Sequence, residues 1–254
     1  LTHEVAYYAG LYTGEYFRMR SGADSPLTLV ANDHRFSSNS LKHYVCQGLI
    51  EAGCLIGDCG CLPTSVASYA MRKRADGGVV VTASHNPPEH NGLKFFDSTG
   101  GVLKPPVEEA LTAQVLARVM DDDSIPQRLI TRGYALQNPD EVIADYAGDV
   151  LRAITLPRPV RAAVDCRFGT ATTIMPLLLE QMGCEADLLH GRLHPYFIKE
   201  NGDYLSPEPK ESNIEEIRAF MGPGGHDVGL IFDGDSDRNV IVDDAGNPVP
   251  ESLA

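Results

Sequence analysis

Ser84 stands where an apolar run of the chain gives way to a loop stiffened by proline, and a serine presented in this way can act as a nucleophile. Residues 78–82 read Gly-Val-Val-Val-Thr, a β-branched run that predicts a buried strand. Pro87 and Pro88 each fix φ and disfavour helix at the residue before them. We therefore expect Ser84 on a defined loop at the carboxyl end of a strand, which is where α/β sheets bind ligands.

Three more side chains near Ser84 predict a site that handles phosphate. His85 and Asn86 follow the serine directly, and Lys94 stands across the loop. An imidazole, an amide and a cation near one hydroxyl suit a site that must hold a phosphate and move a proton. The alternative is a polar surface loop between two core strands, with Lys94 in solvent.

A second group of polar residues follows another apolar run, at residues 228–232. Asp233, Asp235 and Asp237 alternate along the chain, and Arg238 comes directly after them. Carboxylates so close together repel one another and are costly to bury unless a cation joins them. A hard divalent metal ion is the natural partner, and Arg238 is either a counter-ion of the acids or a phosphate ligand.

The same acids admit two other interpretations. A calcium-binding EF-hand loop also alternates acids, but it needs glycine at its sixth position and glutamate at its twelfth, where this chain has Arg238 and Asp244. The flanking residues predict strands, whereas helices flank an EF-hand loop. A solvated acidic turn is the second interpretation, and it stays open for the motif taken alone.

Two motifs in a fixed order carry a family resemblance. TASHNP at residues 82–87 is followed by NGLK at residues 91–94, and DGDSDR stands at residues 233–238. Together they resemble the phosphoserine loop and the metal-binding loop of the α-D-phosphohexomutase family, the phosphoglucomutase and phosphomannomutase enzymes. Each motif leaves an apolar strand, as the family's loops do.

Weaker similarities lie in three further segments. Residues 30–38, VANDHRFSS, are similar to the family's Gly-Arg-Asp-x-Arg-x-Ser-Ser segment, with Asn32 and His34 as departures. Residues 205–209, LSPEP, are similar to the His-Pro-x-Pro segment of the family's second domain, with Ser206 in place of the histidine. The segment that begins with Asp165 resembles the start of the family's second domain. Arg167 and Phe168 depart from the Gly-Asn-Gly turn that is usual there.

The resemblance implies an enzyme that interconverts hexose 1-phosphate and hexose 6-phosphate, with hexose 1,6-bisphosphate as the intermediate. Ser84 would carry a phosphoryl group, whose oxygen would join the three aspartates around Mg²⁺. Lys94 would transfer the proton of the sugar hydroxyl. The implied catalytic residues are Ser84, His85 and Lys94, the phosphate-binding ones Asn86, Arg35 and Arg238, and the metal ligands Ser84, Asp233, Asp235 and Asp237.

Four domains are usual in that family, and the chain resembles the first two. Neither the sugar-reading Gly-Glu-x-Ser-Gly-His loop nor the Arg-x-Ser-Gly-Thr phosphate loop is in its sequence. We therefore expect a fragment of a longer protein that is inactive alone. Phosphoglucomutase/phosphomannomutase activity is favoured, and phosphoglucosamine mutase activity is the alternative within the family. A non-catalytic regulatory relic and a metal-dependent phosphatase are alternatives outside it.

Composition narrows the choice of partners. The chain has 254 residues and a formal net charge of −14, which argues against nucleic acid, since Lys and Arg must neutralise its phosphates. No apolar stretch approaches the ~20 residues of a membrane span, so we expect a cytoplasmic protein that does not bind membranes. The expected partner is a small phosphosugar, and the expected state is a monomer or homodimer.

Alternating strands and helices predict the elements that position both motifs. The pattern indicates an α/β fold of two consecutive three-layer α/β/α domains, at residues 1–136 and 137–254, with mixed, mainly parallel sheets. Expected strands are residues 27–31, 54–58, 78–82, 160–165, 185–189, 228–232 and 239–242. Expected helices are residues 1–18, 39–52, 64–74, 105–120, 141–154, 172–182 and 212–221. The polar residues 127–139 are the expected linker.

Overall fold

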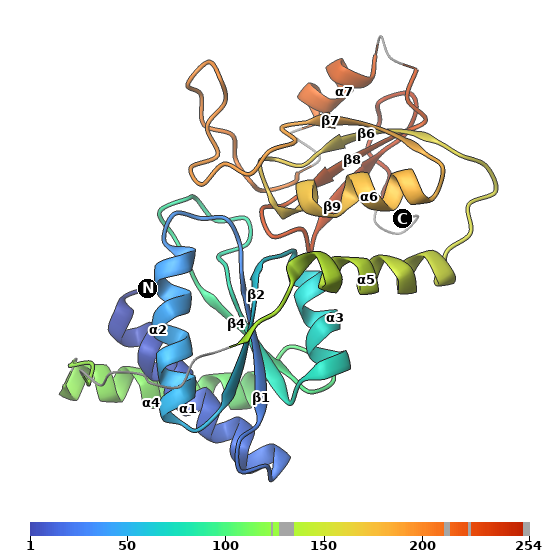
Figure 1. Cartoon of the computed structure of the whole chain (residues 1–254). Helices are drawn as coiled ribbons and strands as arrows, with labels where there is room; N and C mark the ends of the chain where they lie inside the picture. Colours follow the sequence, from blue (N-terminus) through green and yellow to red (C-terminus); the bar gives the residue numbers. More distant parts are fainter. Residues whose placement is uncertain (123, 127–134, 211–213, 223–224, 251–254) are drawn as a thin grey trace. The chain divides into compact units, whose positions relative to one another are not determined.

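A computed structural model describes residues 1–122, 124–126, 135–210, 214–222 and 225–250. The predicted α/β class is confirmed, because the described residues form two sheets of mixed, mainly parallel strands with helices packed on them (Figure 1). The chain divides into two compact units. Each unit contains one of the sheets.

The sheet of unit 1 has five strands in the order β4-β3-β1-β2-β5. Their bounds are β1 Leu27–Asn32, β2 Leu55–Cys61, β3 Gly77–Val81, β4 Leu93–Asp97 and β5 Ala135–Leu136. β1 pairs in parallel with β2 and β3, whereas β4 is antiparallel to β3. The antiparallel pair follows from the short return of the chain after β3, since a parallel neighbour would need a longer crossover.

Among its described residues, unit 1 contains the helices α1 His3–Ser21, α2 Ser38–Glu51, α3 Thr64–Arg74 and α4 Pro105–Asp121, and α5 (Pro139–Ala153) begins in it. α2 and α3 lie on opposite faces of the sheet (Figure 1). α2 buries Val45 and Leu49 against Val30 and Val79 of the strands. α1 and α2 approach so closely that a Cβ at Gly48 would lie 1.9 Å from the carbonyl oxygen of Tyr7. Glycine is therefore required at this helix crossing.

The sheet of unit 2 has four strands in the order β7-β6-β8-β9. Their bounds are β6 Arg161–Asp165, β7 Glu185–Leu189, β8 Val228–Phe232 and β9 Asn239–Val242. α6 (Met175–Gln181) and α7 (Glu215–Met221) cover opposite faces of this sheet (Figure 1). Ala162 of β6 packs in the core beside α6, and the next residue, Ala163, packs in the core beside α7. Alternate side chains of a strand thus fill the two cores of a three-layer unit.

Most predicted elements are confirmed within a few residues, and three differ. The strand β4 (Leu93–Asp97) was not among the expected strands. The helix expected at residues 172–182 is a 3-10 turn, Thr170–Thr173, followed by the separate α6. Pro176 explains the break, because it has no N–H to donate to the carbonyl of Thr172 and fits the first turn of a new helix. The short β5 falls within residues 127–139, which were expected to be irregular. Residues 127–134 of that linker, and the start of the helix expected at 212–221, lie outside the described residues.

The compact units do not follow the sequence continuously. Unit 1 consists of Leu1–Asn32, Ser37–Thr82 and His90–Val142, and unit 2 of Asp33–Phe36, Ala83–Glu89 and Ile143–Ala254. The division near the middle of the chain falls within α5, Pro139–Ala153. The two short segments that follow β1 and β3 therefore cluster with the residues around β8. None of the described helices is both long and apolar enough to cross a membrane.

Candidate functional site

Ser84 lies in a tight turn that follows β3 and belongs to unit 2. The backbone N–H of Asn86 donates to the carbonyl of Ala83 at 3.0 Å and closes the turn. Ser84 has a φ of 52°, in the left-handed region that residues other than glycine rarely adopt, and its residue is 9% exposed. Strained backbone of this kind occurs often at functional sites, where neighbouring contacts hold it.

The Ser84 hydroxyl meets the acidic loop that follows β8. Its Oγ donates to Oδ2 of Asp233 at 2.7 Å. The other oxygen of Asp233 accepts from the backbone N–H groups of Asp237, at 3.0 Å, and Arg238, at 3.1 Å. The predicted nucleophile and the first predicted metal ligand are thus in direct contact, although 149 positions separate them in the sequence.

The three aspartates form one group of oxygen donors. One carboxylate oxygen from each of Asp233, Asp235 and Asp237 lies within 4.8 Å of the others. Asp233 and Asp235 are fully buried, whereas Asp237 is exposed. Oxygen-only donors with two buried carboxylates fit a hard divalent cation such as Mg²⁺, which prefers such ligands.

Electrostatics supports the same interpretation. Burial, and after it the charge of Asp235, raises the pKa of Asp233 to about 7, although hydrogen bonds from Ser84 and from the backbone of Arg238 act in the opposite direction. A carboxyl in this environment is difficult to ionise unless positive charge is added. Arg238 supplies one such charge, because its Nη2 lies 3.2 Å from Oδ2 of Asp233. The same Nη2 donates to Oγ of Ser84 at 3.0 Å.

His85 and Asn86 follow Ser84 in the same turn. Burial, followed by the charge of Arg238, lowers the pKa of His85, so its imidazole is neutral near pH 7. Nδ1 of His85 is buried and has no hydrogen-bond partner among the residues that the structure describes. Asn86 is exposed. Both side chains therefore stand in the turn that carries Ser84, one half-buried and one in solvent.

The other two predicted residues have different surroundings. Lys94 lies on β4, opposite Val80 in the antiparallel pair, and thus belongs to unit 1. Arg35 belongs to unit 2, and it is 2% exposed. Its guanidinium donates to the backbone carbonyl oxygens of Ser84, at 2.6 Å, and Pro87, at 2.7 Å.

Some residues that pack at the Ser84 turn and the acidic loop were not predicted from the sequence. The backbone N–H of Thr170 donates to the carbonyl of Gly234 at 3.0 Å. A Cβ at Gly234 would lie 2.8 Å from the carbonyl oxygen of Ser84 and 3.4 Å from the ring of Phe197. Glycine is required here because two loops meet at its Cα. Its place between Asp233 and Asp235 is the one signal in the sequence that could have indicated this close approach.

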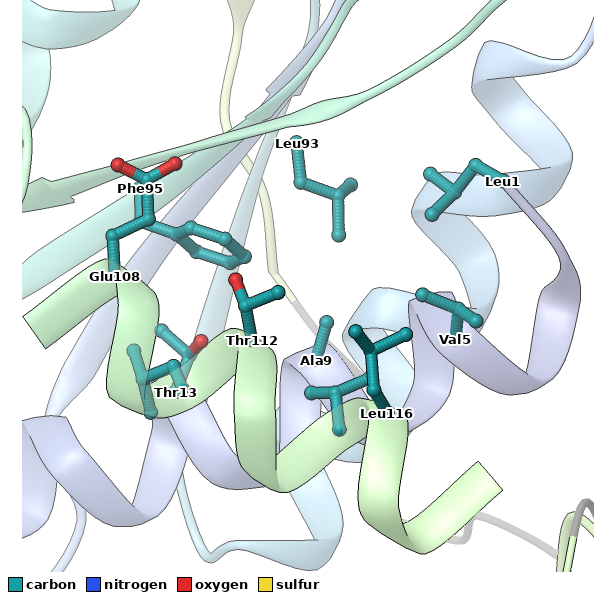
Figure 2. A pocket seen from close by; sticks show the side chains of 11 residues that line it. Leu1, Val5, Ala9, Thr13, Leu93, Phe95, Glu108, Thr112 and Leu116 are labelled. Atoms are coloured by element: carbon teal, nitrogen blue, oxygen red, sulfur yellow. The ribbon is translucent and has the colours of Figure 1, made fainter. Parts of the chain in front are cut away.

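A pocket lies in unit 1, between α1, α4 and β4 (Figure 2). Its lining is apolar except for Thr13, Glu108 and Thr112, and Val5, Leu93, Phe95 and Leu116 contribute to its wall. Such a lining offers apolar contact but lacks the converging polar groups that chemistry requires. The site in unit 2 is therefore the better candidate.

Two family models match most of the chain. The family model described as phosphoglucomutase/phosphomannomutase, alpha/beta/alpha domain I, matches residues 1–120, and that of domain II matches residues 144–246. The phosphoglucosamine mutase of Thermoanaerobacter pseudethanolicus is 32% identical over 254 residues, which cover 98% of this chain and 53% of that protein. The phosphomannomutase/phosphoglucomutase of Pseudomonas aeruginosa is 30% identical over 255 residues, which cover 100% of this chain and 51% of that protein.

A solved structure gives the same result. The crystal structure of a phosphoglucomutase/phosphomannomutase family protein from Burkholderia thailandensis superimposes with a TM-score of 0.82 at 27% identity. The match covers 98% of this chain and 52% of that chain. The chain thus spans about half the length of the relatives it matches.

Proposed function

Because the chain belongs to the α-D-phosphohexomutase family, we propose that Ser84 carries the phosphoryl group that is exchanged between hexose 1-phosphate and hexose 6-phosphate. The observation that carries this proposal is the 2.7 Å contact between Oγ of Ser84 and Oδ2 of Asp233, at the centre of the acidic group. A phosphoryl group on that oxygen stands beside the carboxylates that would hold Mg²⁺.

The reaction transfers one phosphoryl group in each direction. The free hydroxyl of a hexose phosphate attacks the phosphorus of phosphoserine, its oxygen forms the new bond to phosphorus, and the bond to Oγ of Ser84 breaks. The product is a hexose 1,6-bisphosphate. After the sugar reorients, its other phosphoryl group returns to Ser84, and the isomeric hexose monophosphate leaves.

The proton of the attacking hydroxyl needs an acceptor. Lys94 is the proposed acceptor, and its support is the resemblance of its NGLK segment to the family's phosphoserine loop. Proton removal as the oxygen attacks lowers the barrier, as in general base catalysis. His85, with its lowered pKa, stands beside Ser84 as a neutral group that can donate a hydrogen bond to a phosphoryl oxygen.

The charge that develops on the phosphoryl oxygens is met by cations. Arg238 already reaches Oγ of Ser84 at 3.0 Å, and Asn86 stands in the same turn as an amide donor. Asp233, Asp235 and Asp237 would hold Mg²⁺, which neutralises phosphoryl charge and orients the group for in-line attack. The position of Arg238 between serine and acids suits both a charge balance and a phosphate contact.

The proposed substrate is a hexose phosphate of the glucose or mannose series, and glucosamine phosphate is the alternative. Relatives of comparable similarity are named phosphoglucosamine mutase and phosphomannomutase/phosphoglucomutase. The residues of the site that the chain contributes handle phosphate and metal. We therefore propose that they act on the phosphoryl group whichever hexose carries it.

Phosphopeptide mapping tests the proposal. The chain is incubated with glucose 1,6-bisphosphate and Mg²⁺, digested, and analysed by mass spectrometry. We expect one phosphate on the peptide that contains Ser84, none in Ser84→Ala, and an unchanged result in Ser206→Ala, a control in another loop of unit 2. Phosphate on a different residue, or none on the parent chain, would contradict the proposal. Steady release of inorganic phosphate would favour a phosphatase.

A further inference from the structure

We infer that Arg35 is a positioning residue, which holds the backbone of the Ser84 turn and thereby aims the serine hydroxyl at the acids. The inference rests on the proposed function for its kinetic consequence, but its geometric content concerns this chain alone. It assigns Arg35 a role different from the phosphate contact that the family resemblance implies.

The side chain of Arg35 is committed to the backbone of this turn. Nη2 donates to the carbonyl of Ser84 at 2.6 Å, and Nη1 donates to the carbonyl of Pro87 at 2.7 Å. Both distances are short for hydrogen bonds from nitrogen, as expected for a charged donor. Because a guanidinium is planar and rigid, two of its nitrogens hold two carbonyls in one fixed geometry, which the single, freely rotating ammonium of lysine does not impose.

The carbonyl of Ser84 is held from two sides. Arg35 donates to its oxygen, and the Cα of Gly234 lies so close that a Cβ there would be 2.8 Å from the same oxygen. The Ser84 backbone has a φ of 52°, which costs free energy for a residue with a Cβ. A carbonyl fixed in this way keeps the left-handed conformation, and that conformation directs Oγ toward Asp233 and Arg238.

Other residues keep the guanidinium in place. Asp33 accepts from Nε of Arg35 at 2.9 Å and from its backbone N–H at 3.0 Å. The guanidinium also lies over the ring of Phe197, at 5.2 Å from its centroid. Asp33 is 1% exposed and Phe197 is fully buried, so the charge of Arg35 is paired away from water. A buried pair of this kind is costly to break by removing one partner.

A second arginine of unit 2 provides a matched control. Arg167 follows Asp165 at the same spacing as Arg35 follows Asp33, and its backbone N–H donates to Oδ1 of Asp165 at 2.9 Å. Its Nη1 donates to the carbonyl of Ser206 at 2.6 Å. Arg167 is 2% exposed, as Arg35 is. The two arginines thus have the same burial and kind of partner, but Arg167 binds a different loop.

The experiment compares Arg35→Lys with Arg167→Lys in the full chain. Hydrogen exchange followed by mass spectrometry measures the rate of amide exchange in the peptide that covers residues 83–89. Incubation with glucose 1,6-bisphosphate measures the rate of Ser84 phosphorylation. We expect R35K to speed exchange in that peptide by at least about tenfold and to lower the maximal phosphorylation rate by a similar factor, since charged hydrogen bonds are lost. The half-saturating bisphosphate concentration should stay within about twofold, because Arg35 does not touch the sugar phosphate. R167K should leave both readouts close to the parent.

Two outcomes would overturn the inference. A raised half-saturating concentration at unchanged maximal rate would show that Arg35 binds substrate phosphate. Unchanged exchange in the peptide of residues 83–89, with R35K still folded by circular dichroism, would show that Arg35 does not hold the turn. If the parent chain takes no phosphate, the proposed function fails, and the exchange measurement still decides the role of Arg35.

Discussion

Unit 2 contains the same local arrangement twice, and the two copies have different surroundings. Asp33 and Arg35 hold the turn of Ser84, whereas Asp165 and Arg167 hold the carbonyl of Ser206. In both copies an aspartate caps the backbone of the arginine two residues later, and the guanidinium reaches a carbonyl of a distant loop. This Asp-x-Arg unit is therefore a way to fix a loop, and its role depends on which loop the guanidinium binds.

The copies also differ in where the backbone is strained. Beside Arg35 the left-handed residue is Ser84, on the loop that is held. In the other copy the left-handed residues are Arg167 and Phe168 themselves, at φ of 45° and 58°. Burial of the Phe168 ring against Phe197 and Leu205 offsets the free-energy cost of its left-handed backbone. At Ser84 the strained residue carries a hydroxyl that contacts Asp233 and Arg238, and strain of this kind is common at functional sites.

The largest expected effect concerns Asp233, which contacts the serine that the first copy holds. The raised pKa of Asp233, about 7, means that the metal-free folded chain binds a proton that the unfolded chain, at its usual carboxyl pKa, has lost. The contribution of this carboxyl to the free energy of unfolding is therefore fully present below about pH 4. As much as ~4 kcal/mol of that contribution is lost as pH rises through about 7. Urea unfolding in chelator at several pH values measures it.

Two controls sharpen that prediction. Added Mg²⁺ should reduce the loss at pH 7 and above, because the cation stabilises the ionised carboxyls. Asp233→Asn should remove most of the pH dependence, whereas Arg167→Lys should keep it. A metal-free chain whose stability rises between pH 4 and 7, with no change in Asp233→Asn, would contradict the assigned electrostatics.

The next effect concerns the contact between the two loops at Gly234. Gly234→Ala places a Cβ against the carbonyl of Ser84 and the ring of Phe197, and overpacking of this kind costs about 1–3 kcal/mol. Gly222→Ala is the matched control, since Gly222, like Gly234, has no positive φ, but its Cβ position has no neighbour closer than 3.5 Å. Thermal unfolding of both variants decides, and equal losses would argue against the close approach.

The smallest expected effect is the cost of the left-handed backbone at Phe168, in the second copy. Phe168→Ala and Phe168→Gly both lose the packing of the ring, but only glycine accepts a φ of 58° without cost. We expect the glycine variant to be more stable than the alanine variant by about 1 kcal/mol in urea unfolding. An alanine variant that is the more stable of the two would show that this backbone is not held in the left-handed region.

Much of the fold was predictable because local patterns decide it. β-branched runs such as the one before Ser84 gave strands with nearly correct bounds, and Pro105 marked the start of α4. The break before α6 was missed because the pattern of apolar residues continues across it, and only Pro176 carries the signal. Two-residue β5 was missed because so short a strand has no periodicity of its own.

The residues of the candidate site could be selected from the sequence, but their contacts could not. Serine and alternating acids each follow an apolar strand, so residue types and spacing were sufficient to select them. The carbonyl contacts of Arg35 join residues about fifty positions apart, and no local pattern encodes them. Phe197 and Thr170 were missed for the same reason, because their roles depend on tertiary packing against Gly234.

Metal affinity with and without phosphate on Ser84 tests the central claim most directly. Mn²⁺ binding to the unphosphorylated chain and to the chain phosphorylated by glucose 1,6-bisphosphate is measured by isothermal titration calorimetry. If the phosphate oxygen completes the site formed by the three aspartates, phosphorylation should tighten Mn²⁺ binding by at least about tenfold, and Asp235→Asn should weaken it in both forms. Equal affinity of the two forms would contradict a shared site of phosphoserine and metal.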